Sequence, residues 1–197
     1  MRDHFIFRKN NQLKKADKSI KQNWDDKIIN LCELANKNDN YYTTSSCSGR
    51  ILILIDSKEK RDNLFIKVWH NQISFIELKK ELNNLIDSKE KIKNKLIYFK
   101  QDPCILHIAC RNLESAQKIL DIGILAGWKR SSIINSRKRF VIELNSTEKI
   151  EFPIIKEGKL LVDDNFLKII VSESNKKLKT SWEKINKLEN LLKKRLN

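Results

Sequence analysis

The chain has 197 residues, of which 40% are hydrophobic and 33% are charged, and its formal net charge is +15. These proportions exclude a disordered chain and a membrane protein, and this length predicts one domain over residues 1–197. No apolar run approaches the roughly 18 residues that a membrane span needs, and the chain does not begin with a secretory signal. The four cysteines are scattered, which predicts reduced thiols and a cytoplasmic location.

The positive charge has two interpretations. A lysine-rich surface can simply keep a protein soluble, or it can attract a polyanion such as RNA, DNA or an anionic membrane. Clustering favours a polyanion, because segment 127–142 has five basic residues and no acid, and segment 176–197 has eight basic residues and two acids. A membrane is the least favoured partner, because the apolar face of each predicted basic helix is expected to pack against the core and not to be exposed.

The first third of the chain predicts helices and then a strand. Residues 3–36 are expected to be helical with a break near 19–23, and Asp25 is the expected cap of the second half. Residues 43–49 are small and polar, and the apolar run 51–55 follows directly. This pattern predicts a polar loop that leads into a buried strand, and such loops often carry function.

The remaining elements follow from hydrophobic periodicity and turn signals. A charged turn is predicted at 56–63, and a helix at 74–95 has the apolar stripe Ile76, Leu82, Leu85, Ile86 and Ile92. A second helix begins after its cap Asn112 and ends at Gly127. Further strands are predicted at 64–69, 96–100, 104–110, 130–134 and 140–145, with a hairpin at 150–154 and 159–162 around Gly158.

A long last helix follows a cap at Asp163 or Asp164, and Leu178, Trp182, Ile185, Leu188 and Leu192 share one of its faces. This order predicts an α/β or α+β domain with one mixed sheet and flanking helices. A doubly wound nucleotide-binding fold is excluded, because no strand is followed by a glycine-rich phosphate turn.

The segment that ends the predicted polar loop offers several kinds of ligand contact. Its hydroxyls and backbone N–H groups can donate hydrogen bonds, its glycine lets a ligand approach the backbone, and its arginine suits a carboxylate or phosphate. The candidate binding residues here are Ser45, Ser46, Cys47, Ser48, Gly49 and Arg50.

Cysteine and histidine chemistry has less support. Cys104, His107 and Cys110 suggest a metal site, but alternation along a strand puts His107 on the face opposite the two cysteines, so no metal is expected. Cys47 is a candidate nucleophile only if Arg50 or a histidine activates it, and the serines beside it favour a small residue in a tight segment instead. His70 is either a surface histidine or a base in a cleft.

A basic turn is predicted after Gly127. Hydroxyl and amide groups next to lysine and arginine grip phosphate backbones, although the tip of a solvated hairpin has a similar composition. The residues concerned are Lys129, Ser131, Ser132, Asn135, Arg137, Lys138 and Arg139.

Several motifs together resemble a known family. They are Asp17-x-Ser19-x-Lys21 followed by Asp25, the segment Tyr42 to Ile51, His70, Phe99-Lys100-x-x-Pro103-x-Ile105-Leu106-His107, Ala126-Gly127-Trp128-Lys129-x-Ser131 and Asn175-Lys176-Lys177. From Phe5 to about Leu188, the chain resembles the wybutosine-synthesizing protein 3 family, the tRNA wyosine-derivative N-methyltransferases of the archaeal single-domain type. It departs from the family pattern at Gln22, at Trp128 to Arg130, at Ser132 and at Lys184.

The resemblance implies an enzyme with a non-Rossmann fold that uses S-adenosylmethionine and no metal. Its reaction would be methylation of N4 in a 4-demethylwyosine derivative beside the anticodon of tRNA(Phe). His70 or Asp25 would accept a proton, and His107, Gly127, Lys129 and Ser131 would join the segment 45–50 in binding donor or base. The expected contacts to the tRNA are Lys21, Arg137, Lys138, Arg139 and Lys176. The alternative is a non-catalytic basic RNA-binding protein; the oligomeric state is left open, with a monomer favoured.

Overall fold

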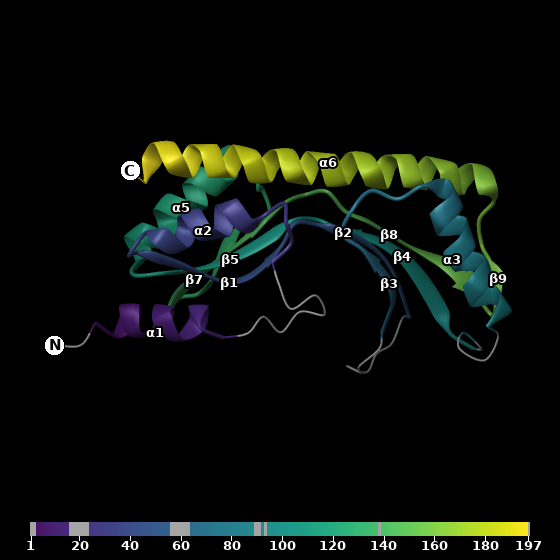
Figure 1. Cartoon of the computed structure of the whole chain (residues 1–197), viewed down its shortest axis with the longest axis horizontal. Coiled ribbons are helices and arrows are strands. Elements are labelled where there is room, and N and C mark those ends of the chain that lie inside the picture. Colours follow the sequence, from purple (N-terminus) through teal and green to yellow (C-terminus); the bar gives the residue numbers. More distant parts are fainter. Residues whose placement is uncertain are drawn as a thin grey trace. The chain divides into compact units, whose positions relative to one another are not determined.

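The computed structural model describes residues 3–15, 24–55, 64–88, 92, 94–137 and 139–196 (Figure 1). The predicted α+β class is confirmed. The strands, however, form two antiparallel sheets rather than one mixed sheet. Hydrophobic periodicity identifies a strand but not its partner, and here two consecutive strands belong to different sheets.

The chain divides into two compact units, each with one sheet. The first unit comprises Met1–Ser48, Pro103–Thr147 and Ser181–Asn197, and the second comprises Gly49–Asp102 and Glu148–Thr180. Each unit therefore combines segments that are distant in the sequence.

The first unit contains a four-stranded sheet of order β1-β5-β7-β6. One face of this sheet packs on α2, α5 and the end of α6, and Phe5 of α1 packs on part of the other face. Its elements are α1 His4–Leu13, α2 Ile29–Lys37, β1 Tyr41–Cys47, β5 Ile105–Cys110, α5 Leu113–Leu125, β6 Ser132–Asn135, β7 Phe140–Asn145 and the second half of α6 Asp164–Arg195.

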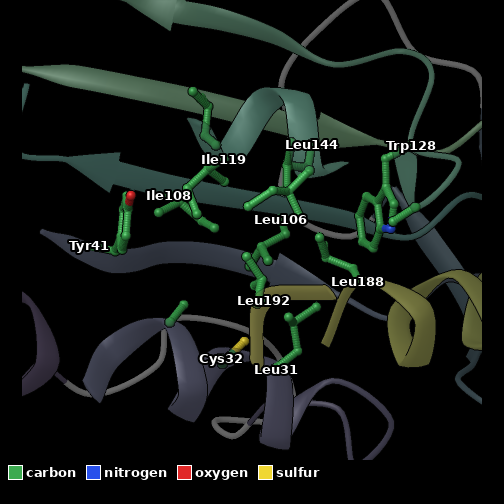
Figure 2. Packing of buried hydrophobic residues seen from close by; sticks show 14 of the residues in the cluster. Leu31, Cys32, Tyr41, Leu106, Ile108, Ile119, Trp128, Leu144, Leu188 and Leu192 are labelled. Carbon is green, nitrogen blue, oxygen red and sulfur yellow. The ribbon is translucent and has the colours of Figure 1, made fainter. Parts of the chain in front are cut away.

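Large apolar side chains form the core of the first unit (Figure 2). Trp128 is fully buried, and its indole Nε1 donates to the carbonyl oxygen of Lys184 at 3.2 Å. Leu188 and Leu192 of α6 pack in the same cluster, as the predicted stripe requires. The stripe thus explains why the end of α6 is held against this sheet.

The predicted polar loop 43–49 is mostly wrong. Residues 41–47 form strand β1, which pairs antiparallel with β5 and has an irregularity between Thr43 and Ser45. Two tyrosines and two threonines begin this segment, and these residue types favour strands. The hydroxyl-rich residues belong to a strand with one polar face, and Ser48 and Gly49 join it to β2.

The second unit contains a five-stranded sheet of order β3-β2-β4-β8-β9. Helix α3 begins with a capping box between Ser74 and Glu77. Its predicted apolar stripe is wrong at Ile76, which is 76% exposed. The elements are β2 Arg50–Ile55, β3 Phe65–Trp69, α3 Phe75–Asp87, β4 Leu96–Asp102, β8 Ile150–Lys156, β9 Lys159–Leu160 and the first half of α6.

Several predicted helix ends are confirmed. Asn112 accepts from the N–H of Ser115 at 2.8 Å, and Asp163 accepts from the N–H of Phe166 at 2.8 Å. Gly127 follows α5 with a φ of +96°, a conformation that favours glycine. The predicted turn 56–63 and helix break 19–23 lie outside the described residues. Within the described ranges, no helix is long and apolar enough to cross a membrane.

Candidate functional site

A row of polar side chains crosses the outer face of the first sheet. The backbone register aligns Ser45 of β1 with His107 of β5, His107 with Glu143 of β7, and Glu143 with Ser132 of β6. Aligned residues of neighbouring strands project from the same face, so these four residues form one line, which we call the polar row. Leu106 and Ile108 point to the opposite face, into the core.

The middle of the polar row is a histidine–carboxylate pair. Nε2 of His107 lies 2.8 Å from Oε2 of Glu143, and the two side chains are 27% and 28% exposed. A carboxylate accepts hydrogen bonds, so in the neutral imidazole of this pair Nε2 carries the hydrogen and Nδ1 carries the lone pair. Glu143 therefore fixes both the ring orientation and the tautomer of His107.

A second line of residues lies two positions further along the same face. It aligns Cys47, Ile105 and Asn145. The backbone N–H of Asn145 donates to the hydroxyl of Ser131 at 3.1 Å, and that hydroxyl donates to the carbonyl of Trp128 at 2.6 Å. Oδ1 of Asn145 is buried and accepts no hydrogen bond from any described residue. An unsatisfied buried acceptor of this kind fits a ligand that brings a donor.

The strand structure of β1 separates the predicted binding residues. Ser45 and Cys47 lie on the outer face, whereas Ser46 is aligned with Leu106 on the core side. Burial raises the pKa of the core thiol Cys32 to about 12, and the nearby Ser46 hydroxyl opposes this shift. Ser46 is therefore part of the packing between β1 and α2.

Asp25 has a structural task in the first unit. Its Oδ2 accepts from the backbone N–H of Ser48 at 2.9 Å and from the Ser48 hydroxyl at 3.1 Å. The predicted cap at Asp25 is wrong, because α2 begins after Ile28 and has no side-chain cap. Asp25 instead closes the end of β1, at 8% exposure.

The segment after α5 is basic and exposed, as predicted. Lys129, Arg130, Arg137 and Arg139 are exposed, and none of them makes an ion pair with a described residue. A pocket of about 440 Å³ lies at the edge strand, lined by residues 133–137. Lys21 and Lys138 lie outside the part of the chain that the structure describes.

Gly127 is in close contact with the last helix. A Cβ atom at this position would lie 3.2 Å from Cε of Lys184. Nζ of Lys184 reaches the hydroxyl of Thr147 at 3.3 Å. The absence of a side chain at Gly127 thus lets the lysine stem pass.

A charged cluster in the second unit contains Arg50. Its Nε donates to Oδ2 of Asp102 at 3.1 Å, and its guanidinium stacks over the ring of Phe65 at 5.1 Å. Lys100 also contacts Asp102, at 3.2 Å. The carboxylate uses one edge of the guanidinium, and Arg50 remains 31% exposed. The remaining N–H groups suit an anionic ligand.

Two further predicted residues of the second unit, His70 and Lys176, lie near a side-chain clamp. Oδ1 of Asn175 accepts from the N–H of Ile73 at 3.0 Å, and its Nδ2 donates to the Ile73 carbonyl at 2.8 Å. The clamp fixes the chain between His70 and α3 against α6. His70 is half-buried, and Lys176 is exposed on α6 beside the clamp.

The predicted faces of β5 are confirmed. Cys104 and Cys110 are buried in the core, and His107 lies on the outer face. Burial raises the pKa of Cys110 to about 12, so its thiol is protonated near neutral pH. Cys47 is half-exposed on the outer face.

The structure thus distributes the predicted residues between the units. The first unit holds Asp25, residues 45–48, His107, Gly127, Lys129 and Ser131, and the second holds Gly49, Arg50, His70 and Lys176. Sequence reasoning missed Glu143, Asn145 and Asp102. Glu143 interrupts an apolar strand, and that interruption is the signal that points to a functional side chain.

Comparison with known proteins identifies the family. The profile of the family described as methyltransferase TYW3 matches residues 7–194. A relative from Methanocaldococcus jannaschii is 40% identical over 85% of this chain and 86% of its own length, and one from Thermococcus sibiricus is 34% identical over 96% and 98%. Both are named tRNA(Phe) 7-((3-amino-3-carboxypropyl)-4-demethylwyosine(37)-N(4))-methyltransferase.

Solved structures share the fold of this chain. The PH1069 protein from Pyrococcus horikoshii is 28% identical, with a TM-score of 0.82 over 94% of this chain and 92% of its own. A hypothetical protein from Aeropyrum pernix, at 22% identity and a TM-score of 0.71, shares the fold. The resemblance drawn from the motifs is confirmed: the chain belongs to the methyltransferase TYW3 family.

Proposed function

We propose that this protein methylates N4 of a 4-demethylwyosine derivative at the position beside the anticodon of tRNA(Phe). The observation that carries the proposal is the family match over residues 7–194, joined by relatives whose names state this reaction. The match extends through segments of both units, so we also propose that the two units act as one functional domain. A tRNA substrate favours action in the cytoplasm.

We infer that S-adenosylmethionine is the methyl donor. When bound, it supplies a methyl group attached to a positively charged sulfur. The sulfur is the leaving group and keeps the electron pair of the broken C–S bond. Within the first unit, the unsatisfied Oδ1 of Asn145 suits its amino group. Ser131 holds the Asn145 backbone in place. We also propose that Ser45, Cys47, Gly127 and Lys129 contribute to binding the donor or the base.

A direct methylation assay tests the function. Purified protein is incubated with S-adenosylmethionine and tRNA(Phe) from cells that lack the activity, and the nucleosides are analysed by mass spectrometry. We expect one added methyl group on the 4-demethylwyosine derivative. Protein that binds this tRNA tightly but adds no methyl group would favour the alternative, a non-catalytic RNA-binding protein.

The exposed arginines at the basic turn give a second prediction. Removing two phosphate contacts with Arg137→Ala and Arg139→Ala is expected to reduce the slope of log K for tRNA against log salt by about 1.4–1.8. The double variant Lys156→Ala and Lys159→Ala removes the same charge from the exposed hairpin of the second unit and serves as the control. Equal slopes for both double variants would contradict a specific role for the basic turn.

A further inference from the structure

The proposed reaction requires a proton acceptor. The substrate name states that N4 lacks the methyl group of the product, so this nitrogen carries hydrogen before the reaction. When the N–CH₃ bond forms, the N–H bond must break. A side chain that accepts this proton in the transition state contributes about 10²–10⁴-fold to the rate.

Asp25 is poorly suited to accept this proton. The residue is 8% exposed, and its Oδ2 already accepts two hydrogen bonds from Ser48. Protonating it would weaken the closure of β1 at the same time. A general base must instead present a free lone pair toward a place that the substrate can reach.

The polar row meets these requirements. His107 is 27% exposed, and its Nε2–H donates to Glu143, so the lone pair of Nδ1 is available for a proton. Glu143 is fixed in its turn by the regular pairing of β7 with β5. Ser45 is the aligned neighbour of His107 on the other side, and Cys47 lies two positions along β1. Neither neighbour brings a positive charge that would oppose protonation of the ring.

We propose that His107 is the general base of the methyl transfer and that Glu143 is its positioning residue, an inference that rests on the proposed function. The ring nitrogen of the substrate bonds to the methyl carbon as the carbon–sulfur bond breaks with its electron pair on sulfur. The N–H proton passes to Nδ1 of His107, and its bonding pair stays on the ring nitrogen. Glu143 stabilises the imidazolium that results.

Single-turnover methylation at saturating donor and tRNA tests the proposal. His107→Ala is expected to lower the rate about 10²–10⁴-fold, and added imidazole is expected to restore part of it. Glu143→Gln is expected to cause a smaller loss that imidazole does not restore. Both variants should bind S-adenosylmethionine and tRNA as the wild type does, because the proton moves only in the chemical step. A structural defect would not produce rescue by imidazole.

The exposed histidine at the start of α1 provides a matched control, since His4→Ala removes the same side chain away from the polar row and should keep the wild-type rate. The proposal is overturned if His107→Ala retains the wild-type rate, or if its loss does not respond to imidazole while that of His70→Ala does. If the wild-type protein itself does not methylate the tRNA, the proposed function fails, which is a different outcome.

Discussion

Replacing Trp128 with alanine is expected to lower the free energy of unfolding by about 3–5 kcal/mol. The side chain is fully buried in the core of the first unit, among residues of β5, α5 and α6 (Figure 2). The substitution removes a large apolar volume and leaves the Lys184 carbonyl without its indole donor. Urea denaturation followed by circular dichroism measures the change.

Two further variants define what the Trp128 result means. Trp128→Phe keeps most of the volume but loses the hydrogen bond, so its cost should be clearly smaller. Trp69→Ala removes a half-buried tryptophan from the second unit and is the matched control. An equal cost at Trp69 and Trp128 would contradict the view that the buried cluster around Trp128 is the main source of stability in the first unit.

The second large effect is expected at Arg50. If its remaining N–H groups hold an anionic group of the donor or the tRNA, Arg50→Ala removes charge-assisted hydrogen bonds worth about 1.5–3 kcal/mol. That loss corresponds to a dissociation constant about 10–150-fold larger. The fold should survive, because Lys100 still neutralises Asp102 at 3.2 Å.

Calorimetry with S-adenosylmethionine and filter binding with tRNA show which ligand Arg50 holds, because only the affinity for that ligand should fall. Arg50→Lys keeps the positive charge but not the two-pronged geometry, and we expect an intermediate loss. Wild-type affinity for both ligands, together with wild-type methylation, would rule out Arg50 as a clamp.

Helix positions were the most predictable part of the fold. Caps such as Asn112 and Asp163 and the stripe on α6 depend on local chemistry that the sequence displays directly. Sheet pairing was less predictable, because β1 pairs with β5, which lies far along the chain. Polar groups at both alternating positions favour the predicted loop 43–49, but a strand with hydroxyls on its outer face has the same composition, and residues up to Cys47 form such a strand.

The candidate site was predictable only in part. The motif residues Ser45, Cys47 and His107 indeed lie on one sheet face. Their partner Glu143 is 36 residues from His107 in the sequence, and only the register of β7 on β5 brings the pair together. A motif residue need not bind a ligand, as Asp25 shows. Its carboxylate accepts hydrogen bonds from the backbone N–H and the hydroxyl of Ser48.

The distribution of the four thiols has a practical consequence. Burial raises the pKa of Cys32 and of Cys110 to about 12, so both thiols stay protonated at pH 8, and Cys104 is buried. Cys47 is half-exposed beside the polar row. A maleimide fluorophore should therefore label the native protein selectively at Cys47, which would place an optical reporter of ligand arrival on that face without any engineered residue.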